Sequence, residues 1–199
     1  MNYMKIKDCD IANGAGVRVS LFVSGCEKRC PGCFNEETWD PSAGEPFTGD
    51  TQEEIIQKVS APYVTGLTLI GGEPLRPENY QTLLDLCKDV HSVIINGQHR
   101  DIWCYTGYTW EELVSKMGDR KTEEAQTLRE LLIEIDVLVE GPFIQELADR
   151  SLRFRGSKNQ SIILSTASVV TLNRVIWEEC GRHDDPFSSN LRSERFDTE

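Results

Sequence analysis

Hydrophobic positions along the chain alternate between a strand pattern and a helix pattern. Four short apolar segments, rich in β-branched residues, are typical of buried strands and cover residues 17–23, 64–70, 100–108 and 136–140. Between them, helical spacing and capping signals predict helices over 51–60, 80–90, 110–117 and 128–135. Strand, loop and helix thus repeat at least four times. This order predicts an α/β fold whose parallel strands are joined by right-handed crossovers.

The number of repeats limits the architecture. Too few strand–helix units are visible for a closed eight-strand barrel, so we expect an open, partial (β/α) barrel. The pattern weakens beyond about Ser165. We therefore predict one domain over 1–164 and a C-terminal extension over 165–199, which is either a flexible tail or a surface that faces a partner.

Composition and charge exclude several classes of protein. The chain has 199 residues and a formal net charge of −12, whereas phosphate binding needs clustered Lys and Arg. No apolar run approaches the ~20 residues of a membrane span, and residues 1–8 lack the apolar stretch of a signal peptide. Seven cysteines, an odd number, cannot all pair in disulfides. We expect a protein of the reducing cytoplasm that binds neither nucleic acid nor membrane.

Cys26, Cys30 and Cys33 lie in one loop that directly follows the first predicted strand. In parallel α/β folds, functional sites are built at the C-terminal ends of the strands. An iron–sulfur cube with a protein thiolate on every iron is built for electron transfer, whereas three thiolates leave one iron free to bind a substrate. A zinc knuckle is the structural alternative, but it needs a fourth ligand, which Cys9 or His99 would have to supply. The spacing of the three cysteines favours an iron–sulfur cluster over a zinc site.

A second motif, Gly71-Gly72-Glu73-Pro74, also ends a predicted strand. Glycine and proline serve ordinary strand-to-helix turns, so the motif alone is a weak signal. It gains weight because it comes one strand–helix unit after the cysteines. Two glycines let a ligand approach the backbone closely, and Glu73 is expected to add charge near an ammonium group.

Together these motifs resemble the radical S-adenosylmethionine (SAM) superfamily. Further segments resemble, within it, the anaerobic ribonucleoside-triphosphate reductase activating proteins; they are 10–18, 30–39, 103–108, 139–143 and 152–160. The resemblance covers most of residues 1 to about 162. Ala15 stands where a proline is usual, and Glu73 and Glu140 stand where aspartates are usual; all three keep the expected role.

The resemblance implies a partial barrel of the radical SAM type and a [4Fe-4S] cluster held by Cys26, Cys30 and Cys33. It implies that the reduced cluster cleaves SAM to a 5′-deoxyadenosyl radical, which takes a hydrogen atom from a glycine of the reductase large subunit. An electron donor such as flavodoxin is implied as a second partner. The expected contacts with SAM come from the residues around the two motifs, namely Gly32, Cys33, Phe34, Gly71, Gly72, Glu73, Pro74 and Thr106.

Two other functions stay open at this point. The first is an activase for another glycyl-radical enzyme, such as pyruvate formate-lyase, although the short length and residues 155–160 favour the reductase. The second is a non-catalytic metal-binding adaptor. The three histidines, His91, His99 and His183, lie in polar surroundings and are expected at the surface.

Overall fold

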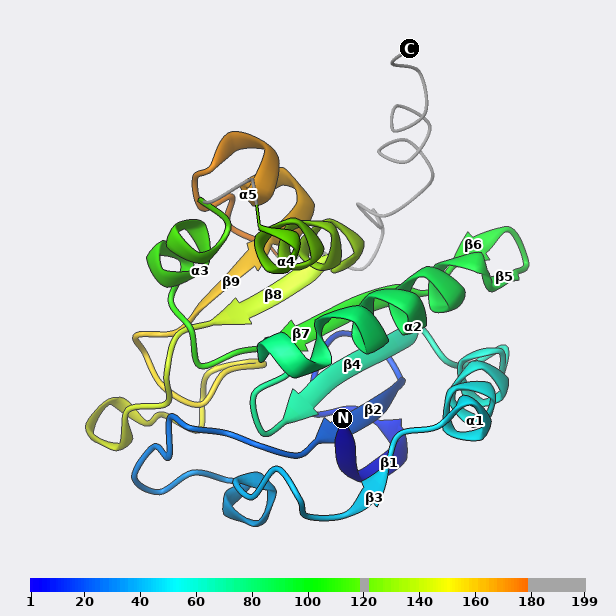
Figure 1. Cartoon of the computed structure of the whole chain (residues 1–199), viewed down its shortest axis with the longest axis horizontal. Coiled ribbons are helices and arrows are strands. Elements are labelled where there is room, and N and C mark those ends of the chain that lie inside the picture. Colours follow the sequence, from blue (N-terminus) through cyan, green and yellow to red (C-terminus); the bar gives the residue numbers. More distant parts are fainter. Residues whose placement is uncertain (119–121, 179–199) are drawn as a thin grey trace.

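The computed structural model describes residues 1–118 and 122–178. In these residues a seven-stranded sheet has the order β3-β1-β2-β4-β7-β8-β9 (Figure 1). Four strands in its middle run parallel, and they are β2 (Arg18–Val23), β4 (Gly66–Gly71), β7 (Asp101–Tyr105) and β8 (Val137–Glu140). They confirm the four predicted strands. The fold is therefore mixed α/β with a mostly parallel central sheet.

Three outer strands were not predicted, and they run antiparallel to their neighbours. They are β1 (Asn2–Asp10), β3 (Glu45–Pro46) and β9 (Ser161–Leu164). β9 turns back along β8 through the connection 141–160, which contains no α-helix and therefore does not form the crossover that a parallel strand needs. A separate hairpin pairs β5 (Ile94–Ile95) with β6 (Gln98–His99).

Five α-helices occur in the described residues, and those that connect the parallel strands agree with the predicted pattern, although no α-helix follows β8 before β9. The five are α1 (Gly49–Val59), α2 (Tyr80–Ser92), α3 (Trp110–Lys116), α4 (Glu123–Glu134) and α5 (Ser165–Thr171), with short 3-10 turns η1 (Glu36–Thr38), η2 (Pro77–Asn79) and η3 (Gln145–Leu147). α1 begins earlier than predicted because Thr48, not Thr51, is its N-cap: the Thr51 N–H donates to Thr48 Oγ1. No helix in the described residues is long and apolar enough to cross a membrane.

Successive residues of a strand point to opposite faces of the sheet. The two faces have different surroundings. Ile102, Cys104 and Leu138 belong to the main hydrophobic core, together with residues of α2 and α4. Figure 1 shows these two helices over one face of the sheet. Trp103 and Val137 belong to a second cluster, whose other members are Val139, Ala15, Tyr105, Phe154, Ile162 and Trp177. We call this second group the aromatic cluster.

The described part of the predicted extension, 165–178, packs onto the domain. Val169 of α5 is fully buried in the main core. After α5 the chain returns along β9, where the Trp177 N–H donates to the Ile162 carbonyl and the Trp177 ring lies 5.2 Å from the Trp103 ring. The predicted boundary at 164 thus falls between β9 and α5. The rest of the extension, 179–199, lies outside the described residues.

Candidate functional site

The three cysteines lie in residues 24–35, which we call the cysteine loop, between β2 and η1. All three are half-buried free thiols. Gly25 and Gly32 have φ values of 94° and 70°, a region that glycine adopts without strain. The Cys33 N–H donates to the Cys30 carbonyl at 3.1 Å, and the Asn35 N–H points at Cys33 Sγ at 3.4 Å. These bonds form a tight turn between Cys30 and Cys33 and hold the Cys33 side chain against the backbone of the loop.

Backbone hydrogen bonds fix the start of the cysteine loop to the segment that follows it. The Gly25 N–H donates to the Thr38 carbonyl at 2.7 Å, and the Cys26 N–H donates to the Trp39 carbonyl at 3.1 Å. The Ser24 hydroxyl donates to the Ala43 carbonyl at 2.8 Å. These bonds use protein groups alone, so they hold the loop before any ligand binds.

The second motif packs directly against the first. The Gly72 N–H donates to the Val23 carbonyl and the Glu73 N–H to the Gly25 carbonyl, both at 2.8 Å. A Cβ atom on Gly72 would lie only 2.5 Å from the Gly25 carbonyl oxygen. Any larger residue at Gly72 would have to push the start of the cysteine loop away. The glycine that the sequence singled out is thus required by a close backbone approach.

The Glu73 side chain is buried and joins the ends of two strands. Its Oε1 accepts from the Thr106 hydroxyl at 2.7 Å and from the Leu75 N–H at 2.9 Å, and its Oε2 accepts from the Gly107 N–H at 2.7 Å. Burial raises the pKa of this carboxyl, although the three hydrogen bonds oppose the rise. Glu73 therefore positions Thr106, at the end of β7, beside the glycine motif at the end of β4.

A cleft of about 440 Å³ opens beside Glu73. Lys28 of the cysteine loop lies at this cleft, with Nζ 3.1 Å from both carboxylate oxygens of Glu112 and 4.4 Å from the centre of the Tyr108 ring. Lys28 and Tyr108 were not among the predicted site residues, because their contact joins positions 80 residues apart. The full lining is Glu27, Lys28, Glu73, Arg76, Pro77, Glu78, Tyr108 and Lys116.

On its other side the cysteine loop meets the connection between β8 and β9. The Phe34 ring lies 5.2 Å from the Phe143 ring, and both rings pack near Gly156. Gly32 lies against the side chain of Gln145, which would be 3.0 Å from a Cβ atom on the glycine. Gly32 and Phe34 therefore face a different neighbour from Gly72, Glu73 and Thr106. Phe34 is 73% exposed.

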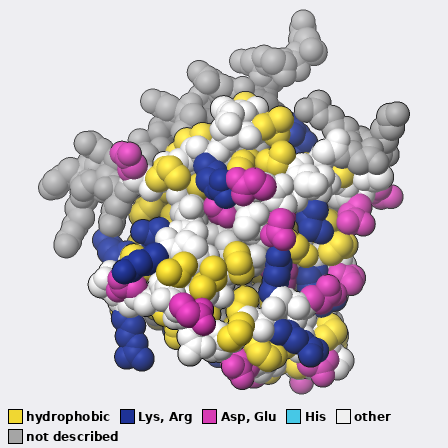
Figure 2. All heavy atoms as spheres, turned by 90° about the vertical axis from the view of Figure 1, so that its left-hand side faces the viewer, with side chains coloured by type: hydrophobic (Ala, Val, Ile, Leu, Met, Phe, Trp, Pro, Cys, Tyr) yellow, Lys and Arg dark blue, Asp and Glu magenta, His cyan; other side chains and the backbone are white. Residues whose placement is uncertain are grey.

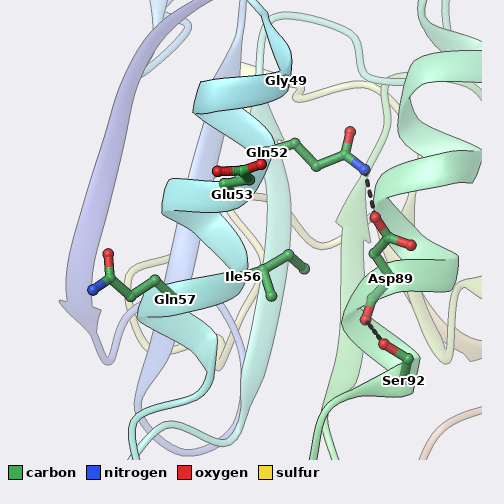
Figure 3. A pocket seen from close by; sticks show the side chains of 7 residues that line it. All are labelled: Gly49, Gln52, Glu53, Ile56, Gln57, Asp89 and Ser92. Atoms are coloured by element: carbon green, nitrogen blue, oxygen red, sulfur yellow. Dashed lines mark hydrogen bonds between the residues drawn. The ribbon is translucent and has the colours of Figure 1, made fainter.

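A larger cleft, of about 670 Å³, lies between α1 and α2 (Figure 3). Gln52 reaches across it and donates to Asp89 at 2.6 Å. The cleft contains none of the predicted site residues; its lining is Gly49, Gln52, Glu53, Ile56, Gln57, Asp89 and Ser92. Size alone therefore does not indicate the functional site in this fold.

The donor set of the cysteine loop fits an iron–sulfur cluster. Among the described residues, no three His, Cys, Asp or Glu side chains are grouped to hold a single metal ion. A cube does not need such convergence, because each of its thiolate ligands binds a different iron. Burial raises the pKa of the Cys26 thiol, and the charge of Glu73 adds to the rise, whereas backbone hydrogen bonds from Lys28 and Arg29 oppose it. If Cys26 binds iron, the metal would have to displace the proton of this thiol.

Comparison with known proteins agrees with this arrangement. A family model described as "4Fe-4S single cluster domain" matches residues 12–163, a span that contains the whole site. The chain is 42% identical to the anaerobic ribonucleoside-triphosphate reductase-activating protein of Vibrio cholerae, over 81% of this chain and 97% of that protein. It is 39% identical to the protein of that name from Escherichia coli K12, with the same coverage. It is 37% identical to that of Enterobacteria phage T4, over 85% and 97%.

Both comparisons extend over most of the molecule, including both motifs and the sheet that carries them. The chain therefore belongs to the family of anaerobic ribonucleoside-triphosphate reductase-activating proteins.

Proposed function

We propose that this chain is a radical SAM enzyme that activates an anaerobic ribonucleoside-triphosphate reductase. The observation that carries the proposal is the cysteine loop, with its three half-buried free thiols at the C-terminal edge of parallel strands. Cys26, Cys30 and Cys33 would hold a [4Fe-4S] cluster. When bound, the cluster and SAM together supply the one-electron cleavage that is needed to create a radical on a glycine of the reductase.

The finer architecture is part of this proposal. We assign β2, β4, β7 and β8, with their helices, to an open radical SAM barrel, and residues 1–164 to the activase domain. The parallel register of these four strands and the functional loops at their C-terminal ends support the assignment.

Contact with SAM is assigned to residues at the ends of these strands. Gly71 and Gly72 would let the cofactor approach the backbone, while Glu73 keeps Thr106 in place through its hydrogen bond. The full set is Gly32, Cys33, Phe34, Gly71, Gly72, Glu73, Pro74 and Thr106. An electron donor such as flavodoxin would reduce the cluster, and the free thiols suit the reducing cytoplasm.

Anaerobic reconstitution tests the proposal directly. We expect about one cubane cluster per chain and, after reduction, conversion of SAM to 5′-deoxyadenosine. Replacing Cys26, Cys30 or Cys33 by Ala should abolish both while far-UV circular dichroism stays unchanged. Cys9→Ala is the matched control, because Cys9 is exposed and lies on β1. A well-reconstituted protein that yields no 5′-deoxyadenosine contradicts the proposal.

The identity of the partner needs a second experiment. The activated chain is mixed with the anaerobic reductase or with pyruvate formate-lyase, and the glycyl radical is measured by electron paramagnetic resonance. We expect a glycyl-radical signal with the reductase and none with pyruvate formate-lyase.

The cysteine variants also test the alternative of a metal-binding adaptor. If they unfold instead of losing only the cluster, the loop has the structural role of such an adaptor.

A further inference from the structure

An exposed apolar rim lies beside the cysteine loop, on the side of the connection between β8 and β9. Phe34 projects from the loop and rests on Phe143, and η3 in the same connection carries Leu147, which is 39% exposed. Gln145 of η3 touches Gly32, so the turn that carries Leu147 contacts the cysteine loop itself. We call Phe34, Phe143 and Leu147 the apolar rim.

The other sides of the cysteine loop are closed by polar contacts. Lys28 is bound to Glu112 on the α3 side, and Arg76 packs over Gly25 on the α2 side, where a Cβ atom on the glycine would overlap the guanidinium group. Towards η1 the loop is held by the backbone bonds of Gly25 and Cys26 described above. The apolar rim is different, because aromatic packing holds the loop there and leaves hydrophobic surface in water.

The charges on this face are mixed. Figure 2 views the molecule from the side at which the parallel strands end, and there hydrophobic side chains lie among basic and acidic ones without a continuous field of either sign. Charge alone therefore does not mark a docking position on this face, although the chain as a whole carries a net charge of −12. The large apolar side chains that stay exposed beside the cysteine loop are the remaining feature that a partner can recognise.

We propose that the apolar rim is the docking site for the reductase, and that an apolar segment of the reductase covers Leu147 and the Phe34–Phe143 pair. This inference rests on the proposed function, which makes the reductase the protein that must reach the cysteine loop. Burial of the rim supplies the affinity, and its contact with the loop places the reductase beside Cys33.

Leu147→Asp tests the proposal, because it puts a charge on the rim without touching the site residues. The backbone bonds of Leu147, from its N–H to the Ile144 carbonyl and from the Lys158 N–H to its carbonyl, do not involve the side chain. The matched control is Ile94→Asp, an exposed apolar residue on the β5–β6 hairpin. Leu147→Ser is a second, milder variant in case the aspartate disturbs η3.

Binding of purified anaerobic reductase to the full-length, reconstituted protein with SAM is measured by titration calorimetry. We expect Leu147→Asp to raise the Kd at least about tenfold, through loss of apolar burial and the cost of covering a charge. Ile94→Asp should leave the Kd within about twofold, and cluster content and reductase-independent SAM cleavage should match those of the wild type in both variants. The loss of affinity in Leu147→Ser should change little between about 50 mM and about 300 mM salt, because apolar contacts are not screened.

The possible outcomes separate the two proposals. If both Leu147 variants bind as tightly as the wild type, the rim is not the docking site, even if the glycyl radical forms normally. If the wild type binds the reductase through the rim but forms no radical, the docking proposal stands and the proposed function fails. If the wild type does not bind the reductase at all, both are overturned.

Discussion

Arg174 ties the segment after α5 to the end of β8, and its removal gives the sharpest test of the packing described above. Its Nε donates to Glu140 Oε1 at 2.7 Å, and its Nη2 donates to Glu111 at 2.7 Å. The second Glu140 oxygen accepts from the Trp110 N–H at 3.0 Å. The Glu140 side chain is only 3% exposed, whereas that of Arg174 is 34% exposed.

The exposure of each partner sets the size of the effect of Arg174→Ala. The substitution leaves a buried carboxylate with one oxygen unpaired. Breaking a fully buried ion pair costs about 3–5 kcal/mol of stability, and losing one hydrogen bond to a charged group costs about 1.5–3 kcal/mol. Water can enter through the exposed side of Arg174, so we expect a loss of about 2 kcal/mol in the free energy of unfolding. The contact with the exposed Glu111 adds only a few tenths.

Urea unfolding of the apoprotein measures this loss, and a double-mutant cycle assigns it. Glu140→Gln removes the buried charge, so the double variant should be more stable than the sum of the two single losses, by about 1 kcal/mol or more. The m-value should stay constant if the compactness of the folded state is unchanged. A loss below about 0.5 kcal/mol for Arg174→Ala, or simple additivity, would show that the ion pair does not hold this corner of the fold.

Three further predictions follow from the site and the core. Gly72→Ala should lower both the cluster content and the unfolding temperature, because its methyl group would meet the Gly25 carbonyl, whereas Gly49→Ala should be neutral because nothing lies within 4 Å of the added atom. Burial would raise the pKa of Asp10, but hydrogen bonds from Ser20 and other donors lower it to about 2. The wild type should therefore lose stability as the pH falls from about 4 to about 2. The Asp10→Asn variant should be less stable at neutral pH but should lose less stability than the wild type in an acid titration followed by circular dichroism. Equal losses in the two proteins would refute the assignment of this pH dependence to Asp10. A chain that ends at 164 loses buried Val169 and the Trp177 contact, so it should aggregate or unfold on size-exclusion chromatography, while a chain that ends at 178 should elute as a folded monomer-sized species.

The central sheet and its helices could be predicted because their hydrophobic positions are strongly periodic. β1, which lies between β2 and the two-residue strand β3, was missed because its residues are mostly exposed or half-buried on both faces, which leaves no clear alternation. The direction of β9 could not be predicted either, because it depends on how the connection 141–160 returns across the sheet.

The candidate site was predicted where its signal is local. Cysteine spacing and the glycine motif lie within short segments, and the structure brings them together through Gly25 and Gly72. Two partners of the Glu73 side chain, Thr106 and Gly107, by contrast lie more than 30 residues further along the chain. His91 was predicted at the surface, but it is wedged between Glu134 and Asp136, and long-range pairs of this kind have no signature in one sequence.

The aromatic cluster also has a consequence for the order of events during synthesis. It joins Ala15 to Trp177, which follows 162 positions later in the chain. Domains translated from their N-terminus can close only those surfaces whose members have already emerged. The main core also contains Val169 of α5, so neither face of the sheet is complete until the segment after β9 has been synthesised.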